Sequence, residues 1–112
     1  MLRVGRSRIK VITPGGNVND GKGGWVQGPD TFVSDRGTLR SPSRTEVEQA
    51  ARENVKLDMV VDVRMGLPVK KGDTIEVSGN LSAFMVESVP GEGIPGRATK
   101  AVFVRAYEKG GN

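Results

Sequence analysis

The chain contains neither cysteine nor histidine among its 112 residues. Without these residues it has no disulfide framework, no thiolate nucleophile and no zinc site built from Cys and His ligands. The missing histidine also excludes a Ser-His-Asp triad and the side chain that most often moves protons near neutral pH. Acid–base chemistry would rest on carboxylates, lysine or tyrosine, so we expect a protein that is not an enzyme and has no catalytic residues, metal or cofactor.

Long apolar runs are missing as well. The longest nearly apolar stretch, residues 57–63, is interrupted by Asp58 and Asp62, whereas a membrane span takes about 20 apolar residues. After the basic start of the chain only Val11 and Ile12 follow as an apolar run before Pro14, and a secretory signal needs a run of about 7–15 apolar residues. We therefore expect no membrane partner, and synthesis in the cytoplasm.

The sequence contains only weak signals for the binding of nucleotides or nucleic-acid bases. Aromatic residues make up 4% of the chain, and Phe84 and Phe103 lie among apolar neighbours, so we expect both in the core. Too few aromatic residues remain for a surface on which bases stack. Residues 91–96 match G-x-G-x-x-G, but Pro95 interrupts the motif and no helix is predicted after it, so a flexible loop is the better interpretation.

Glycine is abundant, with 16 in the chain and six between Pro14 and Pro29. Each glycine raises the entropic cost of ordering, so we expect residues 14–29 to form a mobile loop in the free protein. Loops of this length in small domains tend to be functional. Trp25, the only Trp, either anchors an interface or fills the core at the start of a strand expected over 25–33. The candidate residues for a channel-facing or inter-subunit loop are Gly15, Gly16, Asn17, Asn19, Lys22, Gly23, Gly24 and Trp25.

Positive charge is concentrated at the N-terminus. Residues 1–10 carry four basic side chains and no acid, which equals the formal net charge of +4 for the whole chain. Such a segment either contacts nucleic acid or an acidic partner, or belongs to a solvated first strand within residues 1–12 whose charges keep a sheet edge soluble. The candidate contacts with DNA or an acidic partner are Arg3, Arg6, Arg8 and Lys10.

A capping box marks the one predicted helix. Ser43 and Glu46 match S-x-x-E, which predicts a short helix over residues 44–54. A strand is the alternative, because apolar residues from Val47 onward also share one face of an extended chain, although the Ala-rich composition favours a helix. The polar segment 34–43 before the helix is predicted as a loop. Residues 13–43 are thus expected to consist of loops on both sides of the strand 25–33.

Alternation of apolar and polar residues is clearest over 55–65. Only Val60 breaks the period of two that is typical of a strand with one buried face. Asp58 and Asp62 fall on the polar face of this strand, where ion pairs with neighbouring strands explain them better than a cation site or acid–base chemistry does.

Further strands are predicted over 74–78, 81–89 and 100–107, so that barrel strands occupy residues 55–107. The tail, residues 108–112, should fray. Short strands separated by turns indicate a single all-β domain: a small antiparallel β-barrel or sandwich of about six strands, with one short helix and long Gly-rich loops. The residues expected to be buried are Leu57, Met59, Val61, Val63, Ile75, Val77, Phe84, Val86, Val102 and Val104.

After the strand predicted over 55–65, residues 69–79 read Val-Lys-Lys-Gly-Asp-Thr-Ile-Glu-Val-Ser-Gly, and Phe84 follows in the next predicted strand. From Val55 onward the sequence thereby resembles the head closure, or head-to-tail stopper, proteins of long-tailed bacteriophages. That family shows a strand, then a V-x-x-G-D-x-φ-x-V-x-G hairpin, then a strand with an aromatic-x-Val core, in which Phe84 is the aromatic residue here, and a closing strand. The acidic, Ala-rich segment 43–51 looks like the one that often precedes the first of these strands.

The resemblance implies a non-enzymatic virion protein that acts by assembly. It implies a homo-oligomeric ring at the head–tail interface, between a portal–adaptor complex and the tail proteins, made in the cytoplasm of the bacterial host. Its loops would close the channel after packaging and touch the packaged DNA non-specifically. The alternatives are a neighbouring connector part, such as an adaptor or tail terminator, and a small β-barrel that binds nucleic acid. We expect weak self-association of the free chain, because loops that order on binding spend part of the interface energy.

Overall fold

The computed structural model describes residues 6–19, 21–79 and 83–107. Within these ranges the chain forms one helix and eight strands. In chain order they are β1 (Arg6–Thr13), β2 (Asn17–Asn19), β3 (Trp25–Gln27), β4 (Thr31–Arg40), α1 (Arg44–Glu53), β5 (Met59–Arg64), β6 (Thr74–Val77), β7 (Ala83–Ser88) and β8 (Thr99–Tyr107). Arg3, the first two residues of the strand predicted over 81–89 and the tail 108–112 lie outside the described residues.

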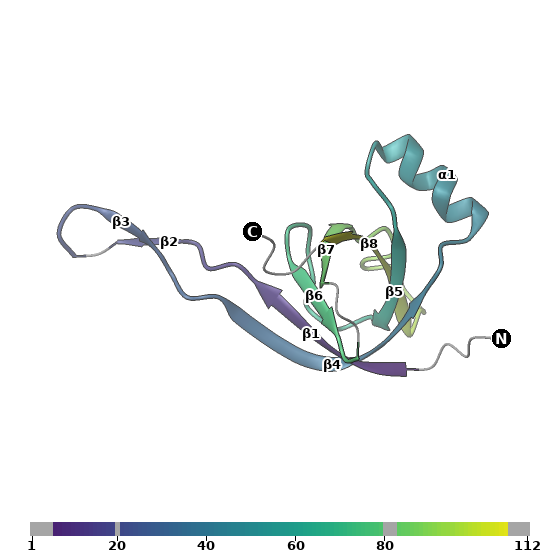
Figure 1. Cartoon of the computed structure of the whole chain (residues 1–112), viewed down its shortest axis with the longest axis horizontal. Coiled ribbons are helices and arrows are strands. Elements are labelled where there is room, and N and C mark those ends of the chain that lie inside the picture. The colour runs from purple at the N-terminus through teal and green to yellow at the C-terminus, as the bar shows by residue number, and fades with distance from the viewer. Residues whose placement is uncertain (1–5, 20, 80–82, 108–112) are drawn as a thin grey trace.

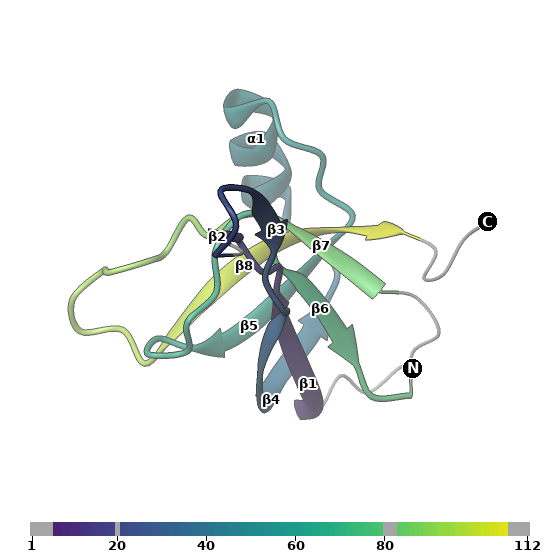
Figure 2. The ribbon, with the colours of Figure 1, turned by 90° about the vertical axis from the view of Figure 1, so that its left-hand side faces the viewer.

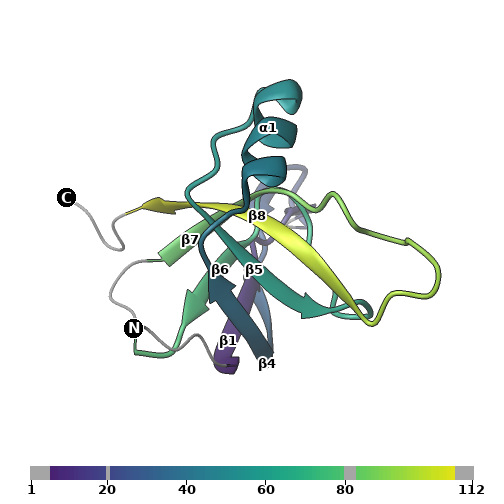
Figure 3. The ribbon, with the colours of Figure 1, turned by 90° about the vertical axis from the view of Figure 1, so that its right-hand side faces the viewer.

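Six of the strands close into an antiparallel barrel, which confirms the predicted all-β fold. Around the barrel they follow the order β1-β4-β5-β8-β7-β6, and β6 pairs with β1 to complete the circle (Figures 2 and 3). Because β1 has a neighbour on each side, it is not a sheet edge. The interpretation of its basic residues as edge protection is therefore wrong, since a closed barrel leaves no edge to protect.

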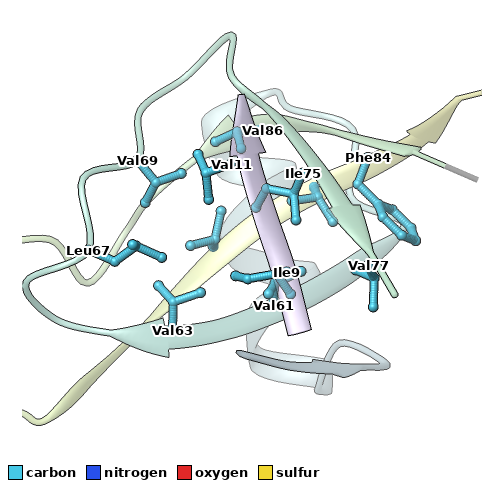
Figure 4. Packing of buried hydrophobic residues seen from close by; sticks show 12 residues of the cluster. Ile9, Val11, Val61, Val63, Leu67, Val69, Ile75, Val77, Phe84 and Val86 are labelled. Atoms are coloured by element: carbon cyan, nitrogen blue, oxygen red, sulfur yellow. The ribbon is translucent and has the colours of Figure 1, made fainter. Parts of the chain in front are cut away.

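Alternate residues of the strands fill the barrel interior (Figure 4). The expected core residues are all buried except Leu57 and Met59, which are partly exposed. Leu67 and Val69, in the segment between β5 and β6, are buried with them although their positions show no strand periodicity. The interior cluster consists of Ile9, Val11, Val61, Val63, Leu67, Val69, Ile75, Val77, Phe84, Val86, Val102 and Val104.

Helix α1 begins at the predicted capping box, so the alternative of a strand is wrong. Ser43 Oγ accepts a hydrogen bond from the Glu46 amide at 3.2 Å, and Glu46 Oε1 accepts one from the Ser43 amide at 2.9 Å. The helix packs Ala50 against Val60 and Phe103 on the outside of the barrel wall. Val60 breaks the alternation of its strand because this part of the outer wall is also covered.

Strand β4 corrects the prediction of a loop over residues 34–43. Its sequence has little apolar periodicity because its outer positions face solvent and two of its inner positions are Asp35 and Gly37. A Cβ at Gly37 would lie 3.0 Å from the carbonyl oxygen of Asp62 and close to the side chains of the core, so the neighbouring strand approaches too closely for a larger residue. The strand expected over 25–33 is interrupted, since residues 28–30 separate β3 from β4. Similarly, β5 begins at Met59 rather than at residue 55.

Candidate functional site

The segment predicted as a mobile loop is the far end of a long β-hairpin. Strands β1 and β4 pair as far as Thr13 and Thr31, and the chain continues beyond the barrel through β2 and β3, which pair with each other. We call residues 14–30 the hairpin arm. The arm points away from the barrel, and the protein measures 55 Å along its longest axis against 32 and 26 Å along the others (Figure 1).

Two hydrogen bonds hold the neck of the arm. The Gly28 amide donates to the Gly16 carbonyl at 2.7 Å, and the Gly15 amide donates to Asp30 Oδ1 at 3.0 Å. A Cβ on Gly15 would lie 2.0 Å from the Gly28 carbonyl oxygen, which no side chain tolerates. The two chains therefore touch backbone to backbone here, and glycine at this position serves close packing as well as flexibility.

The structure brings the eight candidate loop residues together in this arm. Gly15 and Gly16 form its neck, Asn17 and Asn19 lie in β2, and Trp25 begins β3. The remaining three, Lys22, Gly23 and Gly24, belong to the tip, where Gly21 and Gly23 have positive φ angles of 80° and 84°. The paired backbone corrects the prediction of a structureless loop. Fast exchange of its amides in the free protein stays a prediction.

Three of the four candidate basic residues fall on one strand. Arg6 begins β1 opposite Thr38, and Arg8 and Lys10 follow on the side of the strand that faces away from the core residues Ile9 and Val11.

Sequence reasoning missed a further cation on the same surface. Arg36 lies directly opposite Arg8 on β4, in the segment that was predicted as a loop. We call the surface made by Arg8, Lys10, Phe32, Ser34 and Arg36 the outer β1–β4 face.

An ion-pair network ties β4, α1 and β5 together. The guanidinium of Arg40 donates to both carboxylate oxygens of Glu46 at 2.8 and 2.7 Å, and to Asp62 Oδ2 at 2.6 Å. Hydrogen bonds from Arg40 lower the pKa of Glu46 to about 2 from its usual 4.5. Hydrogen bonds to Glu46 and then Asp62 raise the pKa of Arg40. Asp62 thus forms the expected ion pair with a neighbouring strand, whereas Asp58 accepts a hydrogen bond from the Ala106 amide at 2.8 Å.

A buried lysine anchors the loop between β7 and β8. Lys100 has a side chain only 1% exposed, and its Nζ binds the two carboxylate oxygens of Glu92 at 2.8 and 3.0 Å. Residues 91–96, the glycine motif, are thus held as a loop that leads into a strand and not into a helix, as predicted.

Asp73, also buried, caps the turn before β6 by accepting a hydrogen bond from the Lys70 amide at 3.0 Å. Among the described residues no group of three or more carboxylates gathers as a metal site. Within the same ranges no helix is long and apolar enough to cross a bilayer.

In comparisons with known proteins, no family model, curated protein or solved structure matches the chain. The resemblance to phage head closure proteins therefore rests on the residues from Val55 onward and stays a prediction.

Proposed function

We propose that this chain is a structural protein of a phage virion, a subunit of a ring at the head–tail connector. In this proposal the ring closes the DNA channel after packaging and offers a docking surface to the tail. The hairpin arm is the observation that carries the proposal. A closed barrel has no free sheet edge through which to associate, so we expect its neighbours to contact the segments that project from the barrel. The arm projects furthest (Figure 1).

The dimensions suit a ring. A strand rises about 3.3 Å per residue, so the chain from Thr13 to Asn19 carries the arm roughly 20 Å beyond the barrel. The protein is 32 and 26 Å across its two shorter axes, which makes the reach of the arm comparable with the width of a neighbouring subunit. An arm of this length extends onto the next copy or into the channel that the ring encloses.

A ring also needs two different faces, because rotational symmetry joins one surface of each subunit to a different surface of the next. The arm, helix α1 and the loop 89–98 project from the barrel in three directions (Figures 1 and 3). This geometry supports separate surfaces for the neighbouring subunit, the portal–adaptor side and the tail side.

Complementation of a phage that lacks the gene tests the proposal. Deleting residues 17–27 removes β2, the tip and β3 from the arm and joins Gly16 to Gly28, which already lie side by side with a hydrogen bond of 2.7 Å between them. We expect the shortened protein to fold, because no barrel strand is lost, and to yield heads that leak packaged DNA or fail to join tails. The matched control is K71Q, an exposed change in the turn before β6 that lies outside the arm, α1 and the loop 89–98, which should restore normal particles.

Two results would contradict the proposal. Normal infectious particles without the gene would show that the chain is no connector component. Normal DNA-filled, tailed particles with the shortened protein would show that the arm neither closes the channel nor joins subunits. Tails of irregular length on full heads would instead identify the chain as a tail terminator.

A further inference from the structure

Two arginines face each other on the outer β1–β4 face. Arg8 and Arg36 are directly opposite in the antiparallel register, and both are exposed. In the described part of the chain, neither guanidinium takes part in an ion pair or a hydrogen bond. Like charges directly opposite each other destabilise a sheet. An anion bound between the two side chains would therefore stabilise this pair of strands.

A hollow lies between these arginines. Its volume is about 420 Å³, and Arg8, Ser34, Asp35 and Arg36 line it. Asp35 does not neutralise the pair, because its carboxylate accepts hydrogen bonds from Arg64 Nε and from the Arg36 backbone amide. Two positive charges therefore remain in excess around the hollow, next to the hydroxyl group of Ser34.

The next cation along β1 beyond this hollow is Lys10, which has Glu76 of β6 opposite it on its other side. Lys10 lies two residues from Arg8 on the same face, which is about 7 Å at the rise of a strand. Its ammonium group sits 4.2 Å from the centre of the Phe32 ring, and Phe32 is 62% exposed. A single phosphate ion does not span such a row of cations. The backbone of a nucleic acid does, since it carries one charge for every ~3.4 Å of axis along each strand.

We propose that the outer β1–β4 face binds the phosphodiester backbone of DNA. One phosphate lies between Arg8 and Arg36, whose planar guanidinium groups bind phosphate oxygens in pairs, and the next lies at Lys10. Contacts of this kind position a duplex without reading its sequence. The inference rests on the proposed function only in naming packaged DNA as the natural ligand, because DNA binding by the isolated chain is measured separately.

The experiment titrates a short DNA duplex into the isolated protein while its backbone amides are followed by NMR. We expect the largest shifts at Arg8, Ser34 and Arg36. The double variant R8Q/R36Q is compared with R52Q/R97Q, which removes the same charge from two exposed arginines elsewhere. Loss of two phosphate contacts lowers the slope of log affinity against log salt by about 1.8. Between roughly 50 and 200 mM salt, the wild-type affinity should therefore fall roughly 12-fold more than that of R8Q/R36Q.

Several outcomes would overturn the inference. Equal affinity and salt dependence for the two double variants would show that the arginine pair is not the site, as would shifts at other residues. Shifts with inorganic phosphate but not with the duplex would indicate a free anion as ligand. Equal binding of poly-glutamate would indicate an acidic protein partner. If wild-type protein fails to bind DNA while the arm deletion still gives leaking or tailless heads, only this inference fails. If DNA binds but loss of the gene is harmless, only the connector proposal fails.

Discussion

Replacing Glu46 with Gln separates the charge of this residue from its role in the helix cap. Glutamine still accepts the hydrogen bond from the Ser43 amide, because the capping box tolerates Gln in place of Glu. What E46Q removes is the ion pair with Arg40, which joins the start of α1 to β4 and, through Asp62, to β5. We expect the folded structure to persist with a lower free energy of unfolding.

The pKa of Glu46 sets the scale of the loss. A pKa of about 2 in place of 4.5 corresponds to roughly 3 kcal/mol at neutral pH if the whole shift acts on stability, at about 1.4 kcal/mol per unit. The Arg40 side chain is 31% exposed, so water screens part of the attraction. We therefore expect E46Q to lower the free energy of unfolding by about 1–2 kcal/mol at pH 7.

The sign of the pH dependence follows from the direction of the shift. Because the folded protein depresses the pKa of Glu46, the stabilisation is complete above the unfolded value of 4.5 and is lost as the pH falls toward about 2. Urea unfolding of wild type and E46Q between pH 7 and pH 2 should therefore show two curves that converge in acid. E48Q, which removes an exposed pair with Arg44, should change little at any pH. A difference between wild type and E46Q that is absent at pH 7, or that persists unchanged at pH 2, would refute the reasoning.

Two further substitutions test the core and the arm. V61D places a charge at a fully buried position and should unfold the barrel, since an unpaired buried charge costs several kcal/mol. The control V47D, on the exposed side of α1, should still fold. An unchanged melting temperature for V61D would mean that the strand register is wrong. G15A forces a methyl group against the Gly28 carbonyl and should speed amide exchange at Gly28 while barrel amides stay protected. G16A, where a Cβ meets nothing within 4 Å, is its control, and equal exchange at Gly28 in both variants would contradict the close contact.

Local sequence signals predicted the parts of the fold that local physics determines. The capping box at Ser43 and Glu46 predicted the start of α1, because both hydrogen bonds join residues three apart. Alternation predicted that Val61 and Val63 point into the barrel, since a strand with one buried face repeats every two residues. The burial of Val60 on the outer side of its strand could not be predicted from alternation. It depends on helix α1, which packs against Val60 only in the folded chain.

The candidate site was only partly predictable, because its decisive contacts join distant parts of the sequence. Strand β4 carries an aspartate and a glycine at inner positions, so the sequence shows no alternation of apolar residues that would predict a strand there. Without β4 there is no way to place Arg36 opposite Arg8, or to see that Arg40 lies beside Glu46 and Asp62. The arm was predicted as a loop because its glycine content indicates flexibility. Glycine content carries no information about whether two chain segments pair with each other.

The most direct test of the connector proposal is the position of the chain in an assembled particle. A phage that encodes the protein with a C-terminal peptide tag is purified, and a gold-labelled antibody against the tag is located by electron microscopy on particles opened at the junction. The proposal predicts one cluster of label at the head–tail junction of each particle, and particles without label from a phage that carries the untagged gene. Label spread over the head or along the tail, or purified particles that lack the protein altogether, would contradict it.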